Sequence, residues 1–298
     1  MKYNGSDSWY EDDNLLKRRL AYAFLRLRGK IYNNPIRIIG SFLGVIFSKM
    51  PIIFSSSLKE KINLTTIMPP ESLGIKVVVD RRKDYGRAQF CSKERLTCDW
   101  IKKYYNKGDV IYDVGANIGA VSLIAAMYLE RDCEIYSFEP LPTTYSMLFK
   151  NIMLNNCEKI ITPLNIALSN KTKIEQLHLT SIEAGSSGHG VSGNFSNENK
   201  IIKTLTVLTQ TLDNIINSYH ISKPNHIKID VDGHDYEVLL GAENIFKDSS
   251  LRTILIERNN DMDKVRALVE SHGFVEVELK DEQRGEFENM GFVRKDLV

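Results

Sequence analysis

The second half of the chain alternates short apolar runs with amphipathic segments. The apolar runs predict strands at residues 109–114, 134–138, 160–168, 226–231, 253–257 and 274–279. Apolar residues at helical spacing predict helices at residues 118–129, 142–155, 236–246 and 261–271. This alternation is typical of an α/β fold, in which helices cover both faces of a parallel sheet.

The region before this alternation predicts a hairpin and a helix. Residues 75–80 and 87–91 are predicted as strands around a turn at residues 83–86. Residues 92–105 are predicted as a helix that Ser92 caps. We therefore expect a main domain that begins with these elements.

The predicted elements divide the chain into two parts. Residues 1–74 are expected to form a helical N-terminal extension, and residues 75–298 the main domain. Within that domain, residues 75–107 hold the hairpin and helix, and residues 108–298 hold the α/β core.

The N-terminal extension is basic. From Asn14 to Lys59 it has no acidic residue, and apolar residues recur at helical spacing through residues 16–31. The uncharged run at residues 38–48 is shorter than the roughly 20 residues that cross a bilayer. Two interpretations stay open: the extension packs on the main domain, or it lies on an anionic membrane surface.

Charge and cysteine content narrow the class of protein. The chain has 39 Lys and Arg against 38 Asp and Glu, a balance that disfavours nucleic-acid binding. None of the 4 cysteines forms a C-x-x-C pair, so we expect reduced thiols and no zinc site. The chain opens without a secretory signal. We expect a cytoplasmic protein, with peripheral contact to the inner face of a membrane as the further possibility.

A segment rich in Gly, Ser and Asn interrupts the core at residues 180–200. Such a composition predicts a loop. The loop is either a plain connection or a lid over a ligand. His189 within it is expected at the surface or in a cap, because it has no metal-ligand spacing.

A glycine loop follows the first predicted core strand. Its pattern is Asp113-x-Gly115-x-Asn117-x-Gly119, which lacks the second glycine of the dinucleotide motif G-x-G-x-x-G. A nicotinamide oxidoreductase is therefore disfavoured. An acid before the loop suits a cationic amino-acid ligand, whose ammonium group Asp113 would hold directly or through water. Alternatively, Asp113 is a structural cap.

The next two predicted strands end in further candidate residues. Glu139 ends the second strand, where a carboxylate can accept hydrogen bonds from both hydroxyls of a ribose. Asn165 and Ala167 close the third strand, where an adenine edge would lie. These positions indicate a nucleoside-bearing ligand at the carboxyl edge of the sheet.

Spaced motifs extend this pattern through the core. They are Gly108 to Val110, Asp113 to Gly119, Phe138 to Pro142, Leu148, Asn151, Leu154 and Asn155, Asn165 to Ser169, Thr211 to Asn214, Ile227 to Asp235, and Val238 to Ala242. With these motifs, residues 95–274 resemble the FkbM family of S-adenosylmethionine-dependent methyltransferases. Asp232 stands where the family more often has Glu, and His234 and Asp235 replace a plainer pair.

The resemblance implies a Rossmann-like class I methyltransferase fold with a seven-stranded, mostly parallel sheet. Residues 291–294 are the candidate for its reversed strand. It also implies S-adenosylmethionine as methyl donor and O-methylation of a hydroxyl on a sugar, polysaccharide, glycolipid or secondary-metabolite-like acceptor. The expected donor site is Asp113, Gly115, Ala116, Asn117, Gly119, Glu139, Pro140, Asn165 and Ala167.

An acidic segment at the fourth core strand supplies the candidate catalytic residues, Asp230, Asp232 and His234, and Glu257 ends the next strand. A hydroxyl acceptor becomes a good nucleophile only as it loses its proton, which His234 or a carboxylate can accept. Asp232 and Gly233 could instead form a turn. A divalent ion is possible there but is not expected, so no metal site is assigned.

A second class of function stays open at the sequence level. The basic extension is compatible with a membrane-surface binding or scaffolding protein that retains the fold without turnover.

Overall fold

The computed structural model describes residues 38–62, 64–80, 82–185, 189–191, 201–258, 261–279 and 289–298. The chain divides into two compact units, Met1–Leu64 and Thr65–Val298. The boundary between the units therefore precedes the predicted domain boundary at residue 74. The reason is that β1 (Thr65–Ile67) pairs with β2 (Lys76–Val78) across the 3-10 turn η1 (Glu71–Leu73).

The described part of the first unit is helical, at residues 38–48 and in α2 (Ile52–Lys61) after Pro51. The Ser55 hydroxyl donates to the Phe47 carbonyl at 2.6 Å and ties the two helices together. No helix among the described residues is long and apolar enough to cross a membrane. The predicted stripe at residues 16–31 lies outside the described residues.

A seven-stranded sheet forms the centre of the second unit, in the order β12-β13-β11-β10-β3-β4-β5. Only β13 runs antiparallel to its neighbours. This arrangement confirms the predicted class I fold, and the reversed strand includes residues 291–294. The strands are β3 (Asp109–Val114), β4 (Cys133–Phe138), β5 (Ile161–Leu164), β10 (His226–Ile229), β11 (Thr253–Glu257), β12 (Phe274–Val277) and β13 (Asn289–Arg294).

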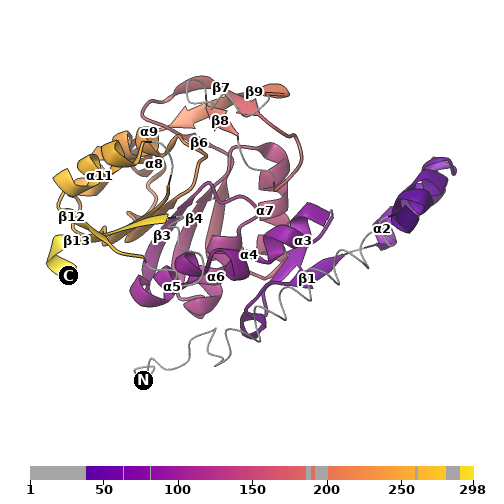
Figure 1. Ribbon diagram of the computed structural model, residues 1–298, viewed down its shortest axis with the longest axis horizontal. Helices are drawn as coiled ribbons and strands as arrows, with labels where there is room; N and C mark the ends of the chain where they lie inside the picture. The colour runs from indigo at the N-terminus through magenta and orange to yellow at the C-terminus, as the bar shows by residue number, and fades with distance from the viewer. Residues whose placement is uncertain are drawn as a thin grey trace. The chain divides into compact units, whose positions relative to one another are not determined.

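Helices cover both faces of the sheet (Figure 1). One face packs against α8 (Leu212–Tyr219), α9 (Asp235–Leu240), α10 (Glu243–Lys247) and α11 (Met262–Ser271), with Tyr112, Ile229 and Phe292 in the shared core. The other face carries α5 (Arg95–Tyr104), α6 (Ala120–Tyr128) and α7 (Pro142–Leu154). The chain ends in a 3-10 turn, η2 (Lys295–Leu297).

The predicted helix at residues 236–246 is two helices, α9 and α10, which are separated at Gly241 and Ala242. A Cβ atom at Gly241 would lie 2.3 Å from the Ser169 carbonyl oxygen. The close approach of the Ser169 backbone leaves room only for glycine at the break.

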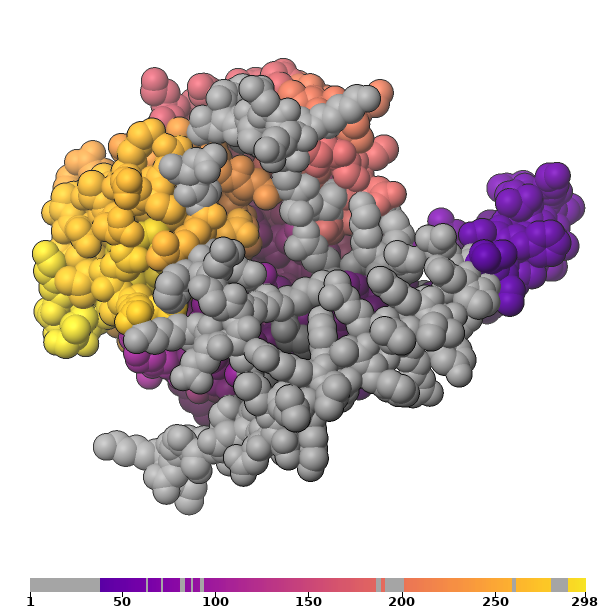
Figure 2. All heavy atoms as spheres, viewed as in Figure 1, coloured from indigo at the N-terminus to yellow at the C-terminus, as the bar shows by residue number. Residues whose placement is uncertain are grey.

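A second, smaller sheet lies beside the first, in the order β6-β9-β7-β8. Its strands are β6 (Ala167–Leu168), β7 (Lys173–Leu179), β8 (Gly190–Val191) and β9 (Lys203–Gln210). The predicted strand at residues 160–168 therefore splits between the two sheets. β7 and β9 were not predicted. In Figure 2 the atoms of this part of the chain are pink to orange, along the upper edge of the view.

The predicted hairpin at residues 75–91 is wrong in its second half. Residues 82–88 form α3 (Arg82–Ala88), and α4 (Phe90–Lys93) follows. Asp84 and Ala88 are both 0% exposed, and their spacing of four places them on one side of α3. Cys91, in α4, is also 0% exposed. The predicted Ser92 cap is also wrong, because α5 begins at Arg95 after Glu94.

The expectation of four reduced thiols is corrected in one respect. Cys91 and Cys98 form a disulfide with a Cα–Cα distance of 6.1 Å, which joins α4 to α5. The sequence did not predict this disulfide, because it placed Cys91 in a strand at residues 87–91, whereas Cys91 lies in α4. Cys133 and Cys157 are free.

Candidate active site

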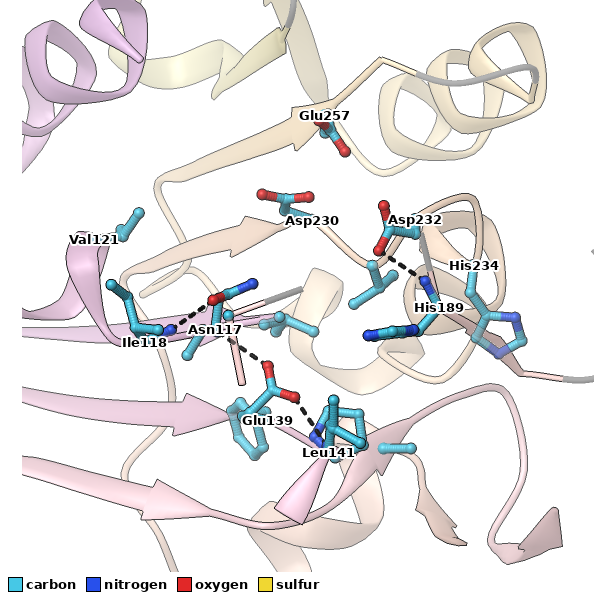
Figure 3. A pocket seen from close by; sticks show the side chains of 18 of the residues that line it. Asn117, Ile118, Val121, Glu139, Leu141, His189, Asp230, Asp232, His234 and Glu257 are labelled. Carbon is cyan, nitrogen blue, oxygen red and sulfur yellow. Dashed lines mark hydrogen bonds between the residues drawn. The ribbon is translucent and has the colours of Figure 1, made fainter. Parts of the chain in front are cut away.

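A cavity of about 690 Å³ opens at the carboxyl ends of β3, β4, β10 and β11. Ligands of open parallel sheets bind at this edge, and the volume is ordinary for a small-molecule site. Figure 3 shows Glu257, Asp230 and Asp232 along one side of the pocket and Asn117, Glu139 and Leu141 across from them. The predicted donor and acceptor residues therefore largely meet in one space.

The glycine loop after β3 is shaped by its close approach to β10. Gly115 has a φ of 80°, and a Cβ atom there would lie 1.9 Å from the Asp230 carbonyl oxygen. Gly119 has a φ of 87°, and its Cβ would lie 2.6 Å from Leu148 Cδ1. Gly115, Ala116 and Asn117 line the cavity. Gly119 does not line the cavity. Its missing side chain lets the start of α6 pack closely against Leu148 of α7.

Two backbone hydrogen bonds hold the Glu139 carboxylate next to the glycine loop. Its Oε2 accepts the Asn117 N–H at 3.0 Å, and its Oε1 accepts the Leu141 N–H at 2.9 Å. Burial raises the pKa of Glu139 to about 7; two backbone hydrogen bonds oppose this shift, and Asp232 and Asp113 add to it. Glu139 therefore changes its charge near neutral pH while it faces the cavity.

Asp113 does not line the cavity. It is 0% exposed, and its Oδ2 accepts the Ser122 hydroxyl at 2.5 Å and the Ser122 N–H at 3.2 Å. Burial raises the pKa of this carboxyl group. Of the alternatives that the sequence left open for Asp113, contact with an ammonium group or a structural cap, these contacts match the cap: Asp113 fixes the start of α6 behind the loop.

Asn165 also acts from outside the cavity. Its side-chain amide donates to the carbonyl oxygens of Glu139, at 2.8 Å, and Pro140, at 3.0 Å. Pro140 and Ala167 line the cavity, together with the unpredicted Ile166. Asn165 therefore orients the backbone beneath a partly apolar wall.

Asp230 forms a cluster with the buried Lys228 and the partly buried Glu257. The Lys228 ammonium lies 2.7 Å from Asp230 Oδ2, and Lys228 is 5% exposed. Asp230 and Asp113 raise the pKa of Lys228 although burial alone would lower it. Burial raises the pKa of Glu257 well above its ordinary value, and the hydrogen-bonded Asp230 raises it further. Glu257 therefore keeps its proton at neutral pH.

Lys228 was not predicted as a site residue. The sequence feature that could have identified Lys228 is its position, a lysine inside an apolar strand. All four residues of β10 are buried. Such a residue needs a partner, and its partners lie on β3 and after β10 itself.

Asp232 both forms a turn and faces the cavity. Asp232 and Gly233 have φ values of 51° and 93°, so the turn that the sequence left open is present. Asp232 Oδ2 accepts the His189 N–H at 3.3 Å. The turn thus presents the Asp232 carboxylate beside the loop that carries His189.

His234 is packed into the wall of the cavity. It is 7% exposed, and its Nε2 lies 3.0 Å from the Ser169 hydroxyl. Burial lowers its pKa. In Figure 3 the ring of His189, rather than that of His234, turns toward the middle of the pocket. The sequence expected His189 at the surface or in a cap and did not assign it to the site; it lines the cavity.

The pairing of β7 with β8 brings His189 to the cavity, because His178 on β7 lies opposite Gly190. The Thr180 N–H donates to His189 Nδ1 at 3.3 Å, and burial lowers the pKa of His189. Thr180, Ser181 and Gly185 line the cavity too. Residues 186–188 and 192–200 of the predicted lid lie outside the described residues. In the described part of the chain, no group of three or more His, Cys, Asp or Glu is arranged to hold a metal ion.

Comparisons with known proteins give a consistent picture. Residues 113–292 match the family described as the methyltransferase FkbM domain. The chain is 30% identical over 155 residues to the hexuronic acid methyltransferase AglP of Haloferax volcanii, and the match covers 52% of this chain and 58% of that protein. The chain thus spans little more than half of this relative.

Similar solved structures share much less sequence. A methyltransferase FkbM from Methylobacillus flagellatus matches 75% of this chain and 57% of its own, with 13% identity and a TM-score of 0.45. TrmK of M. capricolum, solved with S-adenosyl-homocysteine, matches 67% of this chain and 66% of its own, with 12% identity and a TM-score of 0.37.

Proposed function

Because the chain belongs to the methyltransferase FkbM family and is a methyltransferase, we propose that it transfers a methyl group from S-adenosylmethionine to a hydroxyl group of a sugar-containing acceptor. The observation that carries the proposal is the cavity that Glu139 and the Gly115 loop share with Asp230 and Glu257. A nucleoside site and a proton acceptor thus face one another at the edge of the sheet.

The donor half of the cavity fits a nucleoside. The two carboxylate oxygens of Glu139, fixed by backbone N–H groups, keep lone pairs for the hydroxyls of a ribose. Pro140, Ile166 and Ala167 offer a partly apolar wall to a base. When bound, S-adenosylmethionine supplies an activated methyl group on a sulfonium. The glycine loop permits close approach of such a ligand to the backbone.

The acceptor half of the cavity fits a hydroxyl nucleophile. In the proposed step the hydroxyl oxygen bonds to the methyl carbon, and the carbon–sulfur bond breaks with its electron pair going to sulfur. The hydroxyl proton passes to Asp230, whose carboxylate Lys228 holds in place at 2.7 Å. Glu257, protonated, donates its hydrogen bond to Asp230 and orients that carboxylate. Alignment of the acceptor with the methyl group supplies the remaining rate enhancement.

Calorimetry with S-adenosylhomocysteine tests the donor site. We expect the full chain to bind this product and Glu139→Ala to weaken binding about tenfold or more, because both hydrogen bonds to the ribose are lost. Glu130→Ala is the matched control, since Glu130 is exposed, pairs with Lys107 and lies outside the cavity. Absent binding, or equal binding by the Glu139 and Glu130 variants, would remove the donor assignment.

Peripheral contact with a membrane is a second proposal, which the first unit supports. Phe42, Ile52 and Ile53 are 66%, 79% and 78% exposed. Lys59 and Lys61 end α2. Exposed apolar side chains next to cations are typical of helices that lie in a lipid interface. This contact would bring the enzyme to glycolipid acceptors rather than replace turnover. The cytoplasmic location stays a prediction.

Vesicle flotation tests this contact. We expect the full chain to float with vesicles of phosphatidylcholine and phosphatidylglycerol, and the double change Ile52→Ser and Ile53→Ser to abolish flotation. Leu297→Ser with Val298→Ser is the control, because these residues are also apolar and exposed, at 54% and 80%. Flotation that both double variants share, or neither, would contradict a contact through α2.

A further inference from the structure

Helices α3 and α4 contribute one wall of the cavity. Gly86 of α3, Phe90 of α4 and Glu94, which directly follows α4, all line it. These residues precede the match to the methyltransferase FkbM domain, which covers residues 113–292. The wall therefore comes from a part of the chain that the family match does not include. We call Phe90 together with Glu94 the α4 wall.

The backbone of the α4 wall is firmly held. The Glu94 N–H donates to the Phe90 carbonyl at 2.7 Å, and the Cys98 N–H donates to the Glu94 carbonyl at 3.3 Å, so α4 leads directly into the first turn of α5. Cys91, next to Phe90, is joined to Cys98 by the disulfide. A side chain on such a backbone is preorganised, which lowers the entropy cost of binding a ligand against it.

The contacts of α5 place the α4 wall at the acceptor half of the cavity. The Thr97 hydroxyl of α5 accepts a hydrogen bond from the Asn289 side-chain amide at 3.3 Å. Asn289 lies opposite Glu257 in the antiparallel pairing of β11 with β13. The start of α5, and the α4 wall that directly precedes it, therefore lie near the Glu257 end of the sheet. Glu139 of the donor half follows β4, which lies three strands away from β11.

Phe90 is the aromatic side chain that this wall offers to a ligand. Among the described residues that line the cavity, Phe90 and Phe138 are the two that are Phe, Tyr or Trp. Phe138 is 1% exposed and packs in the core against Tyr112, with ring centroids 5.5 Å apart. Phe90 is only partly buried. Its ring is therefore the aromatic surface in the cavity that a ligand can cover.

A sugar ring suits this combination of an aromatic and a polar wall. A pyranose carries C–H groups on its faces and hydroxyl groups around its edge. The face can bury apolar area against an aromatic ring, while the edge forms hydrogen bonds to polar groups. Phe90 supplies the aromatic ring, and Asp230, the proton acceptor of the proposed step, lines the same cavity.

From this placement we infer that Phe90 is a specificity-determining residue: its ring packs against the face of a pyranose in the acceptor and so turns one hydroxyl of that sugar toward Asp230. The acceptor class is thus a glycoside with a six-membered ring rather than an open-chain polyol. This inference rests on the proposed function, because Phe90 can act on a sugar only if a sugar enters beside the donor.

Saturation-transfer NMR on the full chain with bound S-adenosylhomocysteine tests the inference. The probes are the methyl pyranosides of glucose, galactose, mannose and xylose, and sorbitol is the open-chain control. We expect the ring C–H protons of at least one pyranoside to be saturated about threefold or more above those of sorbitol. A lack of saturation of every pyranoside overturns the inference, and so does saturation no greater than that of sorbitol.

Variants at Phe90 show whether its ring causes the binding. Phe90→Leu, which keeps an apolar side chain, should weaken binding of the saturated pyranoside about fivefold, and Phe90→Trp, which keeps an aromatic ring, should not. Phe149→Leu is the matched control, since Phe149 is 49% exposed and lies outside the cavity. Equal affinity of the Phe90→Leu and Phe149→Leu proteins contradicts the inference, and so does an equal loss in Phe90→Leu and Phe90→Trp.

Calorimetry on the same samples separates this inference from the proposed function. S-adenosylhomocysteine should bind equally well to the unaltered chain and to both Phe90 variants. Weaker binding of this product by Phe90→Leu would assign Phe90 to the donor half and overturn the inference. A lack of binding by the unaltered chain would instead contradict the proposed function itself.

Discussion

Single residues at the sheet edge combine a structural and a chemical role, and Glu139 is the clearest case. Its oxygens hold the Asn117 and Leu141 N–H groups, so the same side chain shapes the loop and faces the ligand space. Its position was predictable from the sequence because an acid follows an apolar strand. Its shifted pKa was not, since the shift comes first from burial and then from distant carboxylates.

We predict that the affinity for S-adenosylhomocysteine rises with pH between about pH 6 and 8. Burial raises the pKa of Glu139 to about 7, so its carboxylate, the better acceptor for ribose hydroxyls, forms in this range. The expected gain is about threefold to tenfold. Calorimetry over this pH range measures it, and Glu139→Gln, which does not titrate, should show no such rise. A rise that persists in Glu139→Gln would assign the effect to another group.

We predict that Gly115→Ala lowers the free energy of unfolding by more than about 2 kcal/mol, through left-handed strain and backbone overlap. The new Cβ would lie 1.9 Å from the Asp230 carbonyl oxygen. Gly108→Ala is the matched control: its φ of 86° is similar, but its Cβ would meet nothing within 4 Å. Urea unfolding compares the two, and equal losses would show that overlap with β10 is unimportant.

At the scale of elements, Asn151 of α7 and Asn155, which directly follows that helix, supply hydrogen-bond acceptors to the backbone of β2. Asn151 Oδ1 accepts the Val78 N–H at 2.9 Å, and Asn155 Oδ1 accepts the Lys76 N–H at 2.8 Å. Their spacing of four places both on one face of the helix. The sequence marked these residues as part of a motif without indicating their role, because that role needs a strand about 75 positions away.

We predict that Asn151→Ala destabilises the protein by about 3 kcal/mol, because it leaves the buried Ile118 carbonyl and the Val78 N–H without their partner. Asn151 is 0% exposed and donates to the Ile118 carbonyl at 2.9 Å. The neighbouring Lys150→Ala removes only an exposed pair with Asp80, at 3.5 Å, and should cost little. A small change for Asn151→Ala in thermal and urea unfolding would disprove this docking role.

Across the whole Thr65–Val298 unit, the first helices and the last strand depend on each other. Gly291 in β13 lies against Trp100 in α5, where a Cβ atom would meet Trp100 Cζ3 at 2.3 Å. Asn289 also donates to the Thr97 hydroxyl at 3.3 Å. The contacts between α5, near the start of the unit, and β13, near its end, therefore join the two ends of the unit.

We predict that Gly291→Val lowers the free energy of unfolding by about 1–3 kcal/mol, because the core must make room for the added side chain. Gly44→Ala is the control, since its Cβ would meet nothing within 4 Å. Because the chain also contains Trp9, Trp100 fluorescence during urea unfolding is followed in a Trp9→Phe background. Unchanged stability and emission in Gly291→Val would mean that α5 does not pack on β13 as described.

The sequence by itself determined the order of the core strands and helices, the glycine loop and the acids at the sheet edge. These features are local, since hydrophobic periodicity and turn residues act over a few positions. Tertiary structure alone decided that residues 82–93 are helical, that Asp113 lies behind the loop, and that Lys228 and His189 enter the cavity. Each of these depends on contacts between distant segments, above all the pairing of β7 with β8 and the packing of β10 between β3 and β11. The energy of such contacts is not encoded in any short stretch of chain.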